Sequence, residues 1–183
     1  MTLVYLVLAI LALIGLMVIV LFNALVSKRN MVNNGWADID VQLKRRADLM
    51  PQLVTTVQGY AAHEQTLFED VIERRNNALR MGDDPRKRGV AETELSVPVG
   101  RMLALAEDYP DLKASDTFLE LQSELSETEN KIEMARRFYN GAVRELNVGV
   151  QSFLGNVVAG LLVSRRETFL RSPWPIARSR QST

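Results

Sequence analysis

One unbroken apolar run and two long stripes of apolar residues at helical spacing organise this chain. Residues 3–22, LVYLVLAILALIGLMVIVLF, contain no charged side chain. In a helix that rises about 1.5 Å per residue, a run of this length matches the roughly 30 Å hydrocarbon core of a bilayer. It lacks the basic start of a cleaved secretory signal, and no small-x-small cleavage site follows it. We therefore predict a retained transmembrane anchor over residues 1–25.

The first stripe follows a short juxtamembrane stretch. Asn33-Asn34-Gly35 is a turn signal and predicts an elbow over residues 26–35, with a continuous helix as the alternative. The apolar positions then alternate in steps of four and three, interrupted only at Glu64. They are Leu43, Ala47, Met50, Val54, Val57, Ala61, Phe68 and Val71. Pro51 lacks an amide donor, so we expect it to kink this helix or to restart it after Asp48.

Proline and glycine mark the expected ends of the middle segments. The stretch 81–85, MGDDP, ends the first helical region, and residues 86–89 are expected to form an exposed loop. A second helical piece is predicted over residues 90–107, broken by Pro98 and Gly100. Tyr109-Pro110 stops it, because a residue before proline avoids the helical region.

The second stripe is the most regular in the chain. Ser115 is a good N-cap, and Asp116 suits the first turn of the helix that follows. The stripe reads Phe118, Leu121, Leu125, Thr128, Ile132, Ala135, Tyr139, Ala142, Leu146, Gly149 and Phe153. Glu127–Lys131 and Glu133–Arg137 are spaced for ion pairs along it. With no strand-like alternation, we predict an all-α protein with an antiparallel bundle of three to four long helices over residues 36–163.

The chain ends with an apolar segment and a basic tail. Residues 154–163, LGNVVAGLLV, are too short to span a bilayer, so we interpret them as a core segment or a membrane-surface helix. Residues 164–183 carry five arginines against Glu167, a composition typical of a disordered tail. Membrane lipids are the expected partner of this tail, with a solvated terminus as the alternative, and nucleic acid is not expected.

Basic residues also predict the orientation of the anchor. Lys28 and Arg29 follow it and residues 44–46 are all basic, whereas no basic residue precedes it. Between these groups and the tail, residues 60–134 hold 17 acidic against 9 basic side chains. The positive-inside rule places the N-terminus outside and the domain in the cytoplasm.

Composition excludes several kinds of catalytic site. There is no cysteine, and His63 is the single histidine, which leaves no thiolate site and no multi-histidine zinc site. His63-Glu64 fits neither common helical metal motif, since position 67 is leucine and position 60 is tyrosine. No glycine-rich phosphate loop is present. We expect no catalytic residues, no metal and no cofactor.

The sharpest polar feature flanks the two stripes. Arg45, Arg46 and Asp48 lie within one helical turn of Ala47. In the last predicted helix, polar residues at seven-residue spacing flank the stripe on both sides. Glu133, Asn140 and Asn147 lie on one side, and Glu129 and Arg136 lie on the other. Arg137 is spaced to pair with Glu133. These residues form either a binding constellation or interhelical pairs that fix the register. Because no nucleophile–base pair stands out, we favour the structural and interaction role.

Four blocks of sequence resemble the LemA family. They read FNALVSKRN, DIDVQLKRRADLMPQLVTTVQGYAAHE, AEDYPDLKA and LQSELSETENKIEMARRFYNGAVRELN, and the similarity covers residues 22–163. The resemblance implies a bacterial membrane protein with one N-terminal span, a long-helix bundle and no known enzymatic activity. A related domain in magnetosome-membrane proteins implies a link to membrane organisation. The chain departs from the family pattern at Leu146-Asn147 and at Phe153-Leu154, and the second change predicts that the last helix continues past Phe153.

Two functional hypotheses follow. The first is a non-enzymatic, single-pass scaffold in the bacterial inner membrane that self-associates through coiled-coil-like helix faces. The second is a membrane-tethered sensor or adaptor that binds a partner protein or small ligand in the bundle, through Arg45, Arg46, Glu129 and Arg136. A buried polar pocket among these residues would favour the second hypothesis, and closed ion pairs would not.

Overall fold

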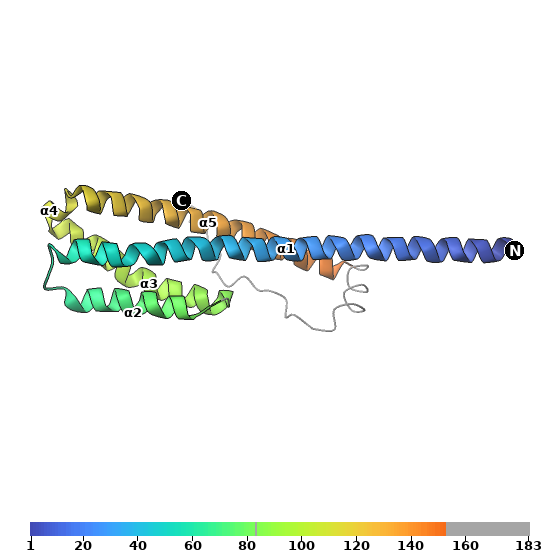
Figure 1. The fold of residues 1–183 in the computed structure, drawn as a ribbon, viewed down its shortest axis with the longest axis horizontal. Coiled ribbons are helices and arrows are strands. Elements are labelled where there is room, and N and C mark those ends of the chain that lie inside the picture. The colour runs from blue at the N-terminus through green and yellow to red at the C-terminus, as the bar shows by residue number, and fades with distance from the viewer. Residues whose placement is uncertain (83, 153–183) are drawn as a thin grey trace, which may run out of the picture. The chain divides into compact units, whose positions relative to one another are not determined.

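The computed structural model describes residues 1–82 and 84–152, and it is all-α as predicted. No strand occurs within these residues. The elements in chain order are α1 (Thr2–Gln58), α2 (Gln65–Arg80), α3 (Pro85–Leu105), the short 3-10 helix η1 (Ala106–Asp108), α4 (Pro110–Lys113) and α5 (Asp116–Gln151) (Figure 1). The predictions for residues 154–163, for the tail over 164–183 and for a last helix that continues past Phe153 lie outside the described residues.

The described residues divide into two compact units. The anchor unit contains residues 1–36 and 137–152, and the bundle unit contains residues 37–136. Both long helices contribute to each unit. Within the anchor unit, Gly35 of α1 lies beside Tyr139 of α5, and Lys28 pairs with Glu145, so the two helices run antiparallel there.

The apolar N-terminal part of α1 is long and apolar enough to cross a membrane, and none of its most apolar window is buried. The expected elbow over residues 26–35 does not form, because α1 continues through Asn33-Asn34-Gly35 without a break. Gly35 serves close packing instead of a turn. A Cβ atom at this position would lie 3.0 Å from Cδ1 of Phe138 and 3.1 Å from Cα of Tyr139. Glycine therefore lets α5 approach the backbone of α1.

The first apolar stripe is buried as predicted, from Leu43 to Val71. The single helical region expected for it is wrong, since residues 59–64 separate α1 from α2. The interruption of the stripe at Glu64 was the visible sign of this break. After it, Phe68 and Val71 pack in the same core as Met50 and residues of α3 and α5.

Neither internal proline ends its helix. Pro51 lies inside α1, so the helix does not restart after Asp48, and the alternative of a kink at Pro51 stays a prediction. Pro98 and Gly100 lie inside α3, so the predicted break there is wrong. Core packing stabilises α3 as one helix on both sides of Pro98, because Leu95, Val99 and Met102 are buried in the shared core. At Tyr109-Pro110 the prediction is confirmed, because η1 ends at Asp108 and α4 begins at Pro110.

The second apolar stripe forms one face of α5. The helix begins at Asp116, and the amide of Leu119 donates to the carbonyl of Ser115 at 3.0 Å. Its seven buried stripe positions are Phe118, Leu121, Leu125, Thr128, Ile132, Tyr139 and Ala142. Glu127 and Lys131 pair as predicted. The stripe therefore supplies the fold with core contacts in both units.

Candidate functional site

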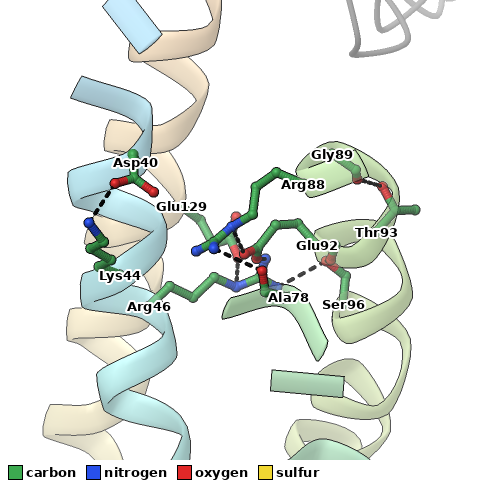
Figure 2. A network of polar contacts seen from close by, with 10 residues as sticks. All are labelled: Asp40, Lys44, Arg46, Ala78, Arg88, Gly89, Glu92, Thr93, Ser96 and Glu129. Carbon is green, nitrogen blue, oxygen red and sulfur yellow. Dashed lines mark hydrogen bonds and ion pairs between the residues drawn. The ribbon is translucent and has the colours of Figure 1, made fainter. Parts of the chain in front are cut away.

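Four charged side chains meet inside the bundle unit, and we call Arg46, Arg88, Glu92 and Glu129 the charge cluster (Figure 2). Arg46 of α1 is 3% exposed and Glu92 of α3 is 1% exposed. Nη1 of Arg46 donates to Oε2 of Glu92 at 3.3 Å, and its Nη2 donates to Oγ of Ser96 at 2.9 Å. Nε of Arg46 lies 2.9 Å from Oε1 of Glu129 on α5. One guanidinium therefore ties α1 to both α3 and α5.

Arg88 brings the end of α2 into the same cluster. Its Nε donates to Oε1 of Glu92 at 3.1 Å, and its Nη1 donates to the main-chain carbonyl of Ala78 at 2.8 Å. The last carbonyls of a helix lack donors from the next turn, so an arginine here acts as a cap. Arg88 thus caps α2 while it holds one side of the Glu92 carboxylate.

Local sequence at the start of α3 explains why Arg88 is buried. The side chain of Asp84 accepts hydrogen bonds from the amides of Arg86 and Lys87, and Pro85 occupies the first turn. This is a strong helix start. It begins α3 early enough to place Arg88 and Glu92 one turn apart on the inner face. The predicted exposed loop over residues 86–89 is therefore wrong, and Arg88 is only 2% exposed.

Burial and neighbouring charges oppose each other in the cluster. Burial raises the pKa of the Glu92 carboxyl above its ordinary value, while the positive charges of Arg46, Arg88 and Arg136 act against the rise. Burial also lowers the pKa of Arg136 on α5, and the negative charge of Glu129 opposes that shift most strongly. The ionised form of Glu92 thus depends on guanidiniums from three helices, α1, α3 and α5.

The structure places the other predicted α1 residues at the surface of the bundle unit. Nη2 of Arg45 lies 3.9 Å from Oε2 of Glu124, and both side chains are about half exposed. Oδ1 of Asp48 lies 3.7 Å from Nη2 of Arg75, with the aspartate 76% exposed. Exposed pairs of this kind contribute about 0–1 kcal/mol each. They align helices weakly compared with the charge cluster.

The remaining predicted residues follow α5. Glu133 lies in the bundle unit, where its charge acts on Arg136. Arg137, Asn140 and Asn147 belong to the anchor unit, where Arg137 is exposed and the two asparagines are half-buried. Of the nine candidate residues, Arg46 and Glu129 form a direct ion pair, and Arg136 and Glu133 lie within their electrostatic reach.

Sequence reasoning missed Arg88, Glu92 and Arg75. The signal for the first two was present, since Asp84-Pro85 marks a helix start and Arg88 and Glu92 are spaced i, i+4. Because residues 86–89 were predicted to form a loop, Arg88 and Glu92 were not considered as a pair on one helix. No local signal identifies Arg75, whose partner lies on another helix.

Two open grooves lie elsewhere in the bundle unit. The first, of about 710 Å³, runs along α2 and the end of α1, and its apolar lining consists of Val54, Phe68 and Ile72. The second, of about 780 Å³, runs between α2 and the end of α3, and half of its ten lining residues are acidic. None of the nine candidate residues lines either groove. Within the described part of the chain, no three His, Cys, Asp or Glu side chains are grouped to hold a metal ion.

The contacts of the charge cluster are those of a structural site that links several helices. Its hydrogen bonds and ion pairs join α1, α2, α3 and α5 around one buried carboxylate, and within the described residues Nη2 of Arg88 is buried without a hydrogen-bond partner. A misaligned helix would leave a charge buried without its partner, at a cost of several kcal/mol. That the polar residues beside the stripes fix helix register stays a prediction.

These features define a class of protein: a helical chain with an apolar membrane-type span at its N-terminal end and a bundle tied together by buried charges. The LemA family model matches residues 35–178, and the chain belongs to the LemA family. It is a membrane-associated helical protein of that family.

Known relatives include proteins from three bacteria. The chain is 26% identical to Protein LemA of Metamycoplasma hominis over 137 residues, covering 75% of this chain and 63% of the relative. It is 23% identical to Magnetosome protein MamQ 2 of Paramagnetospirillum magneticum, covering 75% of this chain and 60% of the relative. Magnetosome protein MamQ of Magnetospirillum gryphiswaldense is 21% identical, with 83% and 65% covered. The chain spans less than two thirds of the length of each of these relatives.

Proposed function

We propose that the protein is a non-enzymatic, single-pass membrane scaffold whose helical bundle self-associates at the membrane surface. The observation that carries the proposal is that α1 contains both the apolar span and the first helix of the bundle, without a break. Because the bundle shares a helix with the anchor, its surface stays close to the membrane, where other proteins can bind it. The magnetosome names of two relatives support a role in membrane organisation.

The charge cluster supports a scaffold over ligand binding or catalysis. Arg46 and Glu129 form a closed ion pair, and Arg46 also reaches Glu92 and Ser96. Neither groove described above is lined by Arg45, Arg46, Glu129 or Arg136, the residues on which the sensor hypothesis depended. The ion pairs of Arg46 support helix alignment instead, as a scaffold requires.

Exposed apolar residues on α3 support self-association. Val90 and Val97 are 61% and 56% exposed, and they lie seven residues apart on one face of the helix. Single exposed valines are ordinary on a protein surface. Two at heptad spacing match the pattern by which helices of separate subunits pack. We assign this face to contact with a second copy of the chain.

The scaffold proposal is tested by the mass of the full-length protein after gentle detergent extraction, measured by light scattering with the detergent contribution subtracted. We expect a discrete multiple of the 20.6 kDa chain mass. The double variant Val90→Glu/Val97→Glu should shift the protein toward the monomer. The matched control Gln122→Glu/Ser123→Glu adds the same charge at exposed positions of α5 and should leave the mass unchanged. A monomeric wild-type protein at membrane-like concentration overturns self-association.

The proposed location is the bacterial inner membrane, with the N-terminus outside and the bundle in the cytoplasm. Lys28 and Arg29, which follow the apolar run, support this orientation. Reporters fused to the C-terminus distinguish the two orientations. A reporter active only in the cytoplasm should work, and one active only outside the membrane should fail. The reverse result overturns the orientation and leaves the anchor itself in place.

The groove of about 710 Å³ beside α2 favours an adaptor as the second candidate function. Its apolar lining at Val54, Phe68 and Ile72 suits the apolar face of a partner's helix. A photo-crosslinking residue at Ile72 in cells tests it. A single adduct with a different protein supports the adaptor, while an adduct of two copies of this chain supports the scaffold.

A further inference from the structure

Two contacts fix the register of α5 against α1 in the anchor unit. A Cβ atom at Gly35 would lie 3.1 Å from Cα of Tyr139, so the two backbones are close there. Further along, Nζ of Lys28 donates a hydrogen bond to Oε2 of Glu145 at 2.8 Å. Lys28 lies seven residues from Gly35, and its partner lies six residues from Tyr139. The antiparallel helices therefore stay in one register over this stretch.

This register places Arg144 of α5 level with Arg29 of α1, and both side chains are exposed. From the contact between Gly35 and Tyr139, Arg29 is about 9 Å along α1 and Arg144 about 8 Å along α5, in the same direction. Arg29 is also seven residues, or about 10 Å, after Phe22, where the apolar run ends. The headgroup region beside a hydrocarbon core is about 5–8 Å thick. A long arginine side chain at this level can reach it.

The anchor unit has a net positive charge outside the apolar run, and the bundle unit has a net negative one. In the anchor unit, residues 23–36 and 137–152 hold four basic side chains against the single carboxylate of Glu145. Lys28 pairs with that carboxylate. The described residues of the bundle unit hold 19 acidic and 13 basic side chains. Arg144 forms no ion pair within the described part of the chain, so its charge is left for an anionic partner.

We propose that Arg144 binds the anionic headgroups of the leaflet from which α1 emerges, so that α5 contacts the membrane surface as well. Anionic lipids attract basic side chains that lie within about one Debye length of the surface, roughly 10 Å at 0.1 M salt. Arg137 is exposed on the same face of α5, one heptad earlier and about 10 Å further from the span. It is therefore a matched control. The inference rests on the proposed membrane anchoring by α1.

Because the chain contains no cysteine, single cysteines can report the height of each position above the membrane in the full-length protein. A nitroxide label is attached in turn at positions 11, 137 and 144, with the protein in vesicles of phosphatidylcholine and phosphatidylglycerol. A lipid that carries a nickel chelate on its headgroup reports closeness to the membrane surface. A water-soluble nickel chelate reports solvent. Leu11 is the reference position inside the apolar run.

We expect the headgroup nickel to relax the label at position 144 more strongly than the label at position 137. The water-soluble chelate should reach both of these labels and should not reach the label at position 11. Equal relaxation of the labels at 137 and 144 by the headgroup nickel overturns the contact of α5, while the anchor stands. A label at position 11 that the water-soluble chelate reaches overturns the anchoring and this inference together.

Charge variants test whether Arg144 itself binds the headgroups. Arg144→Gln and the control Arg137→Gln each remove one positive charge from the same face of α5. Electron paramagnetic resonance measures how strongly the reconstituted protein prefers spin-labelled phosphatidylglycerol over spin-labelled phosphatidylcholine. At 0.1 M salt Arg144→Gln should lose part of this preference and Arg137→Gln should keep it, and 1 M salt should remove the difference. Equal preferences of the two variants at 0.1 M salt contradict headgroup binding by Arg144.

Discussion

Nε of Arg75 on α2 donates a hydrogen bond to the main-chain carbonyl of Ala47 on α1, at 2.6 Å. In an unbroken helix this carbonyl would accept from the amide four residues later, which here is Pro51 and has no N–H. Ala47 is 1% exposed, so water cannot easily replace the missing donor. The arginine of a neighbouring helix therefore supplies it, and α1 passes its internal proline without ending.

This relationship makes Arg75 and Pro51 energetically coupled. Arg75→Met should destabilise the full-length protein by about 1–3 kcal/mol, the usual penalty for leaving a buried polar group unpaired. In a Pro51→Ala background the new alanine amide can satisfy Ala47, so the same substitution should lose most of its effect. Chemical unfolding of the four proteins, followed by circular dichroism, gives the coupling. Equal effects of Arg75→Met in both backgrounds would show that the carbonyl does not need the arginine.

The buried carboxylate of Glu92 should matter far more than its exposed neighbour. Glu92→Leu removes the acceptor of Arg46 and Arg88 and leaves both guanidiniums buried without it, and breaking a buried pair in this way costs about 3–5 kcal/mol. The control Glu94→Leu, two residues later on the same helix, removes a surface partner of Arg74 and should cost far less. Thermal unfolding of the full-length variants measures both. Similar losses for the two would contradict the central role of Glu92.

The sequence predicted the fold class and the buried stripes because hydrophobic periodicity depends on local spacing alone. It predicted a break at Pro98 that does not occur, and of its two alternatives at Pro51 the helix restart does not occur. For Pro51, the compensating group comes from Arg75 on another helix, and no pattern around the proline reveals it. The elbow predicted at Gly35 does not form for a related reason. The glycine makes room for the backbone of Tyr139, a residue far away in sequence.

The candidate site was predicted in part. Arg46 and Glu129 were singled out by their positions beside the two stripes, and they meet at 2.9 Å. Their shared centre, Glu92, was overlooked because its helix was expected to begin after residue 89. Pairing across three helices depends on tertiary geometry, which spacing along one helix cannot supply.

Two glycines of the anchor unit should respond in opposite ways to alanine. At Gly35 the added Cβ would press against Phe138 and the backbone of Tyr139, so Gly35→Ala should be destabilising. At Gly141 on α5 a Cβ would meet nothing within 4 Å, so Gly141→Ala should stabilise by about 0.5–1 kcal/mol through helix propensity. Denaturation midpoints of the full-length variants compare them. Stabilisation by both would mean that α1 and α5 are not in close contact at Gly35.

Two glutamates should titrate on opposite sides of the ordinary value of 4.5. The hydrogen bond from Lys28, followed by its charge, lowers the pKa of Glu145, so this pair contributes stability above pH 4.5 that is lost as pH falls through the lowered value. Burial raises the pKa of Glu92, so its contribution has the opposite sign and is lost as pH rises through the raised value. Side-chain NMR of labelled glutamates gives both midpoints. Lys28→Gln should return Glu145 toward 4.5 and leave Glu92 unchanged.

Charge swaps distinguish an isolated ion pair from the charge cluster. Lys28 and Glu145 are partly exposed and pair with each other, so Lys28→Glu alone should destabilise the protein slightly, and Lys28→Glu/Glu145→Lys should recover most of the loss. Arg46→Glu/Glu129→Arg should not recover, because the new glutamate at position 46 faces the buried carboxylate of Glu92. We expect that double variant to remain several kcal/mol less stable than the wild type, as measured by chemical unfolding. Full recovery of the Arg46–Glu129 swap would mean that Arg46 pairs with Glu129 alone and that the helices are not held around Glu92.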